Sequence, residues 1–559
     1  MPADCTGDGR RTARLEPPGL RLNRPVFLYS VDLSNSVDSV AEAAARVVPQ
    51  EEAHVPDRTI PPTKTPVWLQ PQVVFAVVLL LCVVRGWFAS QTDLVADEGY
   101  YTLWSFHLGA GYLDHPPGVA WVIALGRWLL GENSLGVRLV ALLSPLVISA
   151  ALYRIGLILF DATVAGLSVL WYNLTVGIAL SLLATPDVPS TLFWALAAWG
   201  VAEFIRRGNP NWWLLVGLVA GLGVLGKYTN LFFGLGLLLV IFTSRERLRW
   251  LLLPQLWVGG MIALLVISPN LWWNAEHGWA TAVFQGRRIV DDLYASDPQR
   301  NYFDLIVGQA LFLGPITLAL YVAGTFFWLS RWRHPDHSRL ALPVLSGLPA
   351  LVYFLYHASH SHVEANWLLP LWPMMTLVAA WFALRALPGT KPVRYLGPVA
   401  VYSQVAFGLL VVGFLHWMVL THPPQFADID RSREMHGWAE TRAELDRLAA
   451  EHGAGWIGVA ENYGLIGPLS TYGNFAGSDV PVITIGDLDR FVFRPATDRS
   501  VLSSPGLLVR DGAAVLPNDL FGRIEDLGTV ERRLGSEVVG RYSVLKVSEP
   551  TAAFFAISR

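Results

Sequence analysis

The sequence has few cysteines and few charged residues, and each shortage argues against a class of protein. Cys5 and Cys82 are its only cysteines, so the pattern indicates neither a disulfide framework nor a cysteine metal site. Charged residues make up 15% of the chain, whereas a soluble domain usually carries about 25%. The net charge is −3 and no basic tract occurs. The composition therefore argues against a soluble globular protein and gives no sign of a nucleic-acid partner.

Long apolar runs take the place of the missing charges. They recur from about residue 72 to about residue 420, and several approach the ~20 residues that a helix needs to cross a bilayer. The sequence predicts a polytopic α-helical membrane protein with about 11 transmembrane helices. The predicted spans are residues 70–90, 134–157, 162–184, 188–205, 212–227, 229–243, 249–268, 303–330, 340–356, 366–385 and 395–420.

The chain divides into three regions by composition. Residues 1–65 are polar and rich in proline and do not show a secretory signal, so we expect a flexible cytoplasmic extension. Residues 66–420 form the predicted transmembrane domain, with outer loops at about 91–133 and 269–302. Residues 421–559 combine one helix-like stretch with short β-branched runs, which predicts a small soluble α/β domain. We expect that domain to be a lid or packing module.

The first outer loop contains one further apolar stretch. GVAWVIALGRWLLG, residues 118–131, is short and interrupted by Arg127. This pattern favours a helix that lies at the membrane interface rather than one that crosses.

The basic residues of the short turns indicate how the chain is oriented. Short basic loops stay in the cytoplasm, and these residues occur at alternate turns if the N-terminus is inside. Both outer loops and the C-terminal domain then lie outside. The residues are Arg206, Arg207, Arg245, Arg247, Arg249, Arg331, Arg333, Arg339, Arg385, Lys391 and Arg394.

Four ionisable residues stand close together in the first outer loop. The stretch VADEGYYTLWSFHLGAGYLDHPPGVAW, residues 95–121, contains Asp97, Glu98, Asp114 and His115. Charges near a bilayer are costly unless they have partners or a task, so we interpret the stretch as an active-site loop. A structural alternative stays open, because acids match a helix N-terminus and Asp before Pro is common in turns.

Aromatic and ionisable residues elsewhere on the outer side have two interpretations each. Tyr100 and Tyr101 form either an interfacial belt or a surface that holds a sugar. Asp187 is either the N-cap of a span or part of the site. Arg138 and Lys227 either extend to the interface or hold an anion such as a lipid phosphate.

The second outer loop adds Trp273, Glu276 and His277. Together with carboxylates of the first loop, His277 could bind a divalent metal or donate a proton. The histidine-rich stretch HASHSHVEANW, residues 357–367, is a separate candidate for metal binding.

Five motifs in order resemble one family. They are DEGYYTLWSFHLGAGYLDHPPGVAW, GVRL, TPDVP, GKYTN and PNLWWNAEHGWATAVFQ. They look like the bacterial polyprenyl-phosphate-sugar-dependent glycosyltransferases, which include lipid A aminoarabinose and galacturonic acid transferases and are distantly similar to protein O-mannosyltransferases. The resemblance covers about residues 70–370, and VAENYGLIGPLSTYG is similar to the periplasmic domain of some members. It implies the C-type glycosyltransferase fold in the bacterial inner membrane, with the catalytic loops and the C-terminal domain in the periplasm.

The resemblance also implies roles for single residues. Asp97 takes the position of the family's catalytic carboxylate, and Lys227 resembles the family's lysine at the end of a span. His115 stands where the aminoarabinose transferases often have lysine, which leaves its role open. The implied metal ligands are Asp114 and His277. The implied substrate-binding residues are Glu98, Tyr100, Tyr101, Tyr112, His115, Arg138, Asp187, Lys227, Trp273 and Glu276.

The predicted function is transfer of a sugar from a polyprenyl-phosphate carrier to an acceptor hydroxyl on the outer side. Asp97 would act as the base, and one direct displacement would invert the anomeric centre. We expect lipid A, lipopolysaccharide or another envelope glycan as acceptor, membrane lipids as further partners and no nucleotide cofactor. Alternatives are a protein O-glycosyltransferase and a transporter or flippase for lipid-linked sugars.

Overall fold

The computed structural model describes residues 65–179, 183–291, 297–387, 395–460, 462–512 and 519–558. Residues 64–559 form one compact unit. The predicted cytoplasmic extension lies outside the described residues up to residue 64, and so do Lys391 and Arg394 of the orientation argument.

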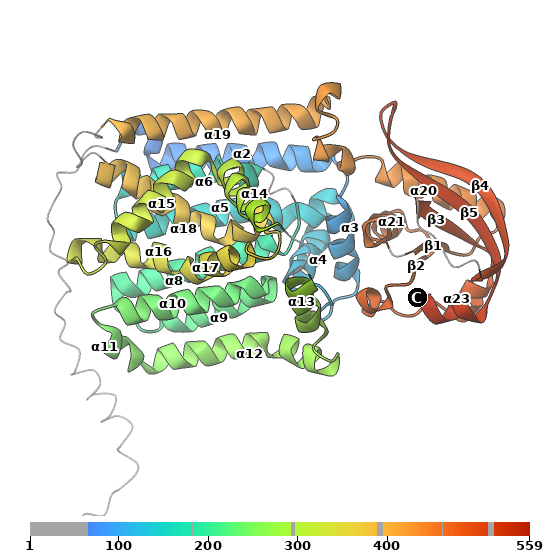
Figure 1. The fold of residues 1–559 in the computed structure, drawn as a ribbon, viewed down its shortest axis with the longest axis horizontal. Helices are drawn as coiled ribbons and strands as arrows, with labels where there is room; N and C mark the ends of the chain where they lie inside the picture. The colour runs from blue at the N-terminus through green and yellow to red at the C-terminus, as the bar shows by residue number, and fades with distance from the viewer. Residues whose placement is uncertain are drawn as a thin grey trace, which may run out of the picture. The chain divides into compact units, whose positions relative to one another are not determined.

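A helical bundle makes up most of this unit, as Figure 1 shows. Its 3-10 and π segments are η1 (Val67–Leu69), η2 (Tyr228–Asn230), η4 (Pro335–Leu340), η5 (Ala365–Leu371) and η6 (Phe382–Ala386). Its α-helices are α2 (Pro71–Gln91), α5 (Ser134–Leu159), α6 (Ala162–Asn173), α7 (Val176–Ala179), α8 (Asp187–Arg207), α9 (Trp212–Gly226), α10 (Leu231–Thr243), α11 (Arg247–Leu251), α12 (Pro254–Glu276), α13 (Ala280–Asp291), α14 (Pro298–Leu313), α15 (Pro315–Leu329), α16 (Ala341–Leu345), α17 (Leu348–His357), α18 (Trp372–Trp381) and α19 (Leu396–Thr421).

The membrane-protein prediction is confirmed, but the count of 11 spans is not. Among the described residues, six helices are long and apolar enough to cross a membrane, or up to eight if each bent pair counts as one span. The predicted span 303–330 is one such pair, because the chain bends by 109° between α14 and α15. Gly314 has φ +101° at this bend and Pro315 begins α15, so the two residues end one helix and start the next.

Small residues let the helices of the bundle approach closely. A Cβ atom on Gly217 of α9 would lie 1.9 Å from the carbonyl oxygen of Gly259 in α12. Helices in a membrane associate through such backbone contacts, because lipid supplies little hydrophobic driving force between them. The outer face stays apolar, with Leu265 and Leu410 both more than 70% exposed, as suits a surface in contact with lipid.

Two helices form the first loop between α2 and α5. They are α3 (Ala96–Phe106) and α4 (Gly118–Leu130), and the second confirms the helix expected at residues 118–131. Gly118 begins α4 against the end of α9, where a Cβ atom would lie 2.5 Å from the carbonyl oxygen of Leu225. The second predicted loop is corrected: α12 continues to Glu276 and α13 follows, so most of residues 269–291 are helical.

A sheet domain follows α19, and we call it the C-terminal domain. Its five strands have the order β2-β1-β3-β5-β4, with β1 parallel to β2 and β3, and β5 antiparallel to β3 and β4. The prediction of an α/β fold is confirmed for this domain. Its elements are η8 (Pro424–Phe426), η9 (Arg431–Met435), α20 (Trp438–His452), β1 (Ile457–Ala460), α21 (Tyr463–Ala476), β2 (Val482–Ile485), η10 (Leu488–Phe491), α22 (Arg499–Ser503), β3 (Gly506–Asp511), β4 (Phe521–Leu534), β5 (Glu537–Pro550) and α23 (Ala552–Ile557).

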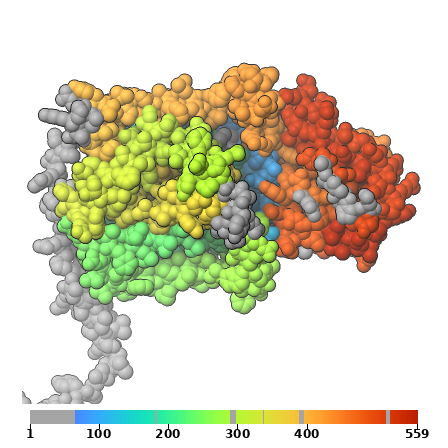
Figure 2. Space-filling model, in the orientation of Figure 1, coloured from blue at the N-terminus to red at the C-terminus, as the bar shows by residue number. Residues whose placement is uncertain are grey.

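The C-terminal domain packs on the first loop through α3 and α21. A Cβ atom on Gly99 would lie 2.6 Å from the backbone nitrogen of Pro468, so the two helices touch at backbone distance. Asp93, just before α3, accepts hydrogen bonds from the backbone N–H of Trp438 (2.8 Å) and the hydroxyl of Tyr472 (3.0 Å). Figure 2 shows the first loop, in blue, recessed between the bundle and this domain.

Candidate active site

Asp97 and Glu98 open α3 and point to different surroundings. Neighbouring helix residues lie about 100° apart around the axis, so one can face solvent while the next faces the interior. Asp97 is exposed, whereas Glu98 is fully buried. Only Asp97 is therefore placed to meet a substrate.

Glu98 forms a buried ion pair with Arg138 of α5. The Arg138 Nη2 donates to Glu98 Oε2 at 2.6 Å and Nε donates to Oε1 at 2.9 Å, and both side chains are 0% exposed. The remaining Arg138 donors bond the carbonyl oxygens of Ala89, Thr92 and Asp93. These contacts occupy both side chains and leave no surface for a lipid phosphate. The prediction that Glu98 and Arg138 bind substrate is therefore not supported, and both residues have a structural role.

Tyr100 and Asp114 form the next layer of the site. The Tyr100 hydroxyl donates to Asp114 Oδ2 at 2.7 Å, and both residues are buried. Arg490 of the C-terminal domain donates from Nη1 to both carboxylate oxygens of Asp114, at 2.8 and 2.9 Å. The first loop and the C-terminal domain thus share one polar network.

Tyr101 lies where several of the predicted residues converge. Burial raises its pKa well above the usual value, and the nearby carboxylates of Asp97, Asp114 and Asp187 raise it further. The ring of His115 lies 6.1 Å from the Tyr101 ring. Residues from α3, from the turn before α4 and from α8 therefore surround one tyrosine, and we call this group the Tyr101 cluster.

Lys227 joins this cluster through Asp187. The Lys227 Nζ donates to Asp187 Oδ1 at 2.7 Å, and the amide of Asn366 donates to Oδ2 at the same distance. Asp187 is the first residue of α8 and Lys227 follows the last residue of α9. Of the two interpretations of Lys227, extension to the membrane interface does not fit the structure, since the buried carboxylate of Asp187 holds the ammonium group.

Side chains from the end of α12 and from α13 form hydrogen bonds with the first loop and pack against it. The side-chain amides of Asn270 and Gln285 donate to the carbonyl oxygens of Ala110 (2.8 Å) and Asp114 (2.6 Å). Trp273 covers Gly111 so closely that a Cβ atom there would lie 2.5 Å from its ring. The surface of the Trp273 ring that covers Gly111 is therefore occupied by the loop and is not available to a ligand.

Tyr112 also holds the loop. Its ring stacks on Trp104 at 4.1 Å, and its hydroxyl donates to the carbonyl oxygen of His107 at 2.9 Å. Tyr112 is 1% exposed, so its predicted contact with substrate is replaced by a structural role.

Asp97 has the electrostatics of a group that holds a proton more readily than usual. Its surroundings raise its pKa: partial loss of hydration beside the protein is the largest cause, although the side chain reaches solvent, and the carboxylates of Asp114 and Glu98 add to it. The Tyr463 hydroxyl donates to Asp97 Oδ1 at 3.3 Å and acts in the opposite direction. A carboxylate that is exposed and raised in pKa is suited to accept a proton.

Comparisons with known proteins identify the class. The family profile described as dolichyl-phosphate-mannose-protein mannosyltransferase matches residues 114–273. The lipid A galacturonosyltransferase RgtD of Rhizobium johnstonii is 27% identical over 388 residues, which cover 68% of this chain and 77% of RgtD. The crystal structure of ArnT from Cupriavidus metallidurans bound to undecaprenyl phosphate has a TM-score of 0.56 at 17% identity and covers 86% of this chain and 99% of ArnT. The chain is a glycosyltransferase of the C-type membrane fold.

The apo structure of the same ArnT gives a TM-score of 0.55 at 16% identity with the same coverage. The resemblance predicted from the five motifs is thereby confirmed, and so is the prediction that the protein is an enzyme.

The two predicted metal ligands, Asp114 and His277, each have other partners in the structure, and their metal role stays a prediction. His277 is exposed, its ring stacks on Trp273 at 4.1 Å, and its Nδ1 lies 2.8 Å from the Trp273 carbonyl oxygen. Asp114 is already engaged by Tyr100 and Arg490. Within the described ranges, no group of three His, Cys, Asp or Glu side chains is placed to hold a metal ion, and this includes the stretch 357–367. We therefore derive no step through a metal.

Sequence reasoning missed the residues that the C-terminal domain contributes to the glycosyltransferase site. Arg490 binds Asp114 and Tyr463 binds Asp97, although they lie 376 and 366 residues away along the chain. Nothing in the local pattern around either residue indicates this. The domain expected to be a lid or packing module therefore contributes side chains to the site. Glu276 is exposed at the end of α12, and its predicted contact with substrate stays a prediction.

The Tyr463–Asp97 contact leads to a pH prediction. The hydroxyl stabilises the charged carboxylate, so Tyr463→Phe removes a contact that lowers the pKa of Asp97. Because the base must be deprotonated, the acid limb of kcat/KM should move to higher pH, by less than about one unit for one long hydrogen bond. Transfer rates measured across pH test this, with Tyr395→Phe at an exposed site as the control. An acid limb that stays in place or moves down would contradict the assignment.

Proposed function

We propose that this enzyme transfers a sugar from a polyprenyl-phosphate carrier to a hydroxyl of an envelope glycolipid, with lipid A as the first candidate acceptor. The similarity to a lipid A galacturonosyltransferase supports the acceptor, and the fold of an enzyme that binds undecaprenyl phosphate supports the donor class. The observation that carries the proposal is the Tyr101 cluster, in which the carboxylates of Asp97 and Asp187 lie near one tyrosine and Asp187 in turn holds the Lys227 ammonium group.

Asp97 is the proposed base. It accepts the proton of the acceptor hydroxyl while the oxygen attacks the anomeric carbon of the donor sugar. Its exposure allows the acceptor to approach, and its raised pKa strengthens it as a base. One displacement of this kind breaks the bond from carbon to phosphate oxygen and inverts the anomeric centre.

Lys227 is the proposed partner of the leaving phosphate. Charge grows on the phosphate oxygen as the glycosidic bond breaks, and a fixed cation stabilises that charge. Asp187 and, through it, Asn366 hold the ammonium group in place before substrate binds. A preorganised cation does not have to reorient during the reaction, which lowers the barrier.

We place the Tyr101 cluster on the periplasmic side. The basic helix α11, with Arg247 and Arg249, lies at the end of the bundle opposite the C-terminal domain in Figure 1. Cytoplasmic turns are enriched in arginine and lysine, so this distribution supports a periplasmic location for α3 and the C-terminal domain. Sugars outside the cytoplasm arrive on lipid carriers, which agrees with the proposed donor.

Purified protein in lipid nanodiscs tests the function. It should be incubated with a panel of polyprenyl-phosphate sugars and lipid A, and mass spectrometry should follow the mass of the acceptor. A gain of one sugar residue on lipid A is the expected result, and NMR of the product should show inverted configuration. The family profile describes a protein mannosyltransferase, so a serine- and threonine-containing peptide is the second acceptor. Transfer to the peptide alone would replace lipid A in the proposal.

Lys227→Gln tests the phosphate contact. Loss of a charge-assisted hydrogen bond should raise the donor KM about tenfold. Lys227→Arg keeps the charge near Asp187 and should recover part of the affinity. Steady-state kinetics with varied donor give both values, and a melting curve for each variant controls for folding. An unchanged donor KM in well-folded Lys227→Gln would remove this residue from the mechanism.

A further inference from the structure

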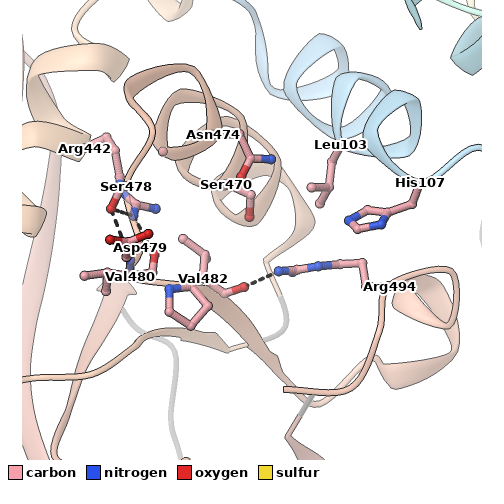
Figure 3. A pocket seen from close by; sticks show the side chains of 12 residues that line it. Leu103, His107, Arg442, Ser470, Asn474, Ser478, Asp479, Val480, Val482 and Arg494 are labelled. Carbon is pink, nitrogen blue, oxygen red and sulfur yellow. Dashed lines mark hydrogen bonds between the residues drawn. The ribbon is translucent and has the colours of Figure 1, made fainter. Parts of the chain in front are cut away.

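A small polar cavity lies where α3 meets the C-terminal domain, apart from the Tyr101 cluster. Its volume is about 190 Å³. Figure 3 shows its lining, which comes from α3, α20, α21, the loop before β2 and the segment after η10. The polar side chains of this lining belong to His107, Arg442, Ser470, Asn474, Ser478, Asp479 and Arg494.

Arg442 forms a fixed wall of this cavity. Its Nε and Nη2 donate to the two oxygens of Asp446 at 3.0 and 2.9 Å, and its Nη1 donates to the carbonyl oxygen of Leu469 at 2.9 Å. A Cβ atom on Gly473 would lie 2.5 Å from Nη1, so the absence of a side chain at this point of α21 makes room for the guanidinium group. The wall is rigid, and Asp446 neutralises its charge.

Ser470 presents a buried hydroxyl to the cavity. The residue is 5% exposed, and its Oγ has no hydrogen-bond partner among the residues that the structure describes. Figure 3 shows the hydroxyl pointing into the space between Asn474 and Val482. Burial of a hydroxyl without a partner is unfavourable, so a polar ligand group that reached this hydroxyl would relieve that cost.

The remaining lining offers both donors and acceptors with nearly balanced charge. Arg494 is held by a hydrogen bond from Nη2 to the Val482 carbonyl oxygen at 2.6 Å, and Asp479 places a carboxylate at the exposed rim. Burial and the nearby Arg494 lower the pKa of His107, which keeps its imidazole neutral. The amide of Asn474 supplies a further donor and acceptor at the exposed rim.

We propose that this cavity binds one sugar residue of the acceptor, at a distance from the reacting hydroxyl; the proposal rests on the proposed function. Sugar hydroxyls both donate and accept, which matches this mixed lining. A cavity of about 190 Å³ is small, which limits its ligand to about one sugar ring. An inorganic anion fits less well, because the Asp479 carboxylate opposes it.

The distance between the cavity and Asp97 determines how long an acceptor must be to reach both. His107 caps the C-terminus of α3, ten residues after Asp97, which is about 15 Å along a helix. An acceptor that reaches both points carries more than one sugar. The cavity therefore selects acceptors with an extended saccharide and anchors them to α3 and α21 while Asp97 acts on the reactive end.

Direct sugar binding by the full-length protein tests the site without any donor. Saturation-transfer NMR in nanodiscs should detect pyranoses such as galactose, glucosamine and galacturonic acid. Asn474→Trp fills the exposed mouth and should abolish the signal, whereas Ala476→Trp, exposed on the same helix outside the cavity, should leave it intact. Ser470→Ala removes one hydroxyl and should weaken binding about three- to tenfold. A signal that survives Asn474→Trp, or displacement of the sugar by inorganic phosphate at this site, would overturn the proposal.

Transfer kinetics separate this inference from the proposed function. Asn474→Trp should raise the KM for a multi-sugar acceptor several-fold and leave the KM for a single-sugar acceptor unchanged. If both KM values change equally, the cavity is not an acceptor subsite. If the wild type binds sugar in the cavity and yet modifies no acceptor, the proposed function is wrong, whereas the assignment of the cavity as a sugar-binding site stands.

Discussion

Asp97→Asn is expected to reduce sugar transfer by about 10²–10⁴-fold, the contribution of a positioned general base. Asparagine has the shape of aspartate and its amide oxygen can still accept the Tyr463 hydrogen bond, so the site should keep its geometry. The amide cannot take up the acceptor proton. Mass spectrometry of the acceptor at saturating donor measures the rate, and donor binding measured separately should stay near the wild-type value.

Glu132→Gln is the matched control for this variant. Glu132 is an exposed acid of the same loop that pairs with Arg127, and such surface pairs contribute little. Its transfer rate should stay close to that of the wild type. Full activity of Asp97→Asn would exclude Asp97 as the base, and equal losses in both variants would point to a general effect on the loop.

Arg138→Met is expected to destabilise the fold rather than to weaken donor binding. Removal of one partner from a buried ion pair leaves the other charge unpaired and costs about 3–5 kcal/mol. Here Glu98 would keep the backbone N–H of Ala184 but lose both contacts from the guanidinium. Thermal unfolding in detergent, together with the yield of folded protein, measures the loss.

The double variant Glu98→Gln with Arg138→Met distinguishes the two roles of this pair. A neutral glutamine does not leave a charge in the interior, so the double variant should recover part of the lost stability. Arg447→Met is the control, since Arg447 is exposed and its pairs with Glu444 and Glu451 lie on the surface. A single Arg138→Met variant that melts like the wild type but loses donor affinity would restore the phosphate-binding role predicted from the sequence.

The helices were predictable because their signal is local. Apolar runs of membrane length gave α2, α5, α8 and α19 within a few residues of their observed bounds. The number of crossings was not predictable in the same way, because a proline or glycine can divide one apolar run into two short helices. Gly314 and Pro315 do this within the run 303–330, where hydropathy stays high across a 109° bend.

The motif residues of the site were found, but their partners were not. The sequence placed Asp97, Asp187 and Lys227 on the outer side, and the structure brings Asp97 and Asp187 near Tyr101, with Lys227 bonded to Asp187. Whether a cation meets a ligand or a buried carboxylate depends on tertiary packing, and hydropathy does not report it. Arg138 illustrates this limit, since its partner Glu98 lies 40 residues away on another helix.

Sugar transfer at Asp97 requires that the α3 end of the bundle face the compartment where lipid-linked sugar is presented. Cysteine labelling tests this most directly, in a chain with Cys5 and Cys82 replaced. Leu108→Cys lies 58% exposed in the first loop and Leu248→Cys lies 71% exposed on α11 at the far end. In intact spheroplasts, a membrane-impermeant maleimide should label the first and reach the second only after the membrane is opened. The reverse pattern, with Leu248→Cys labelled from outside, would contradict the periplasmic site.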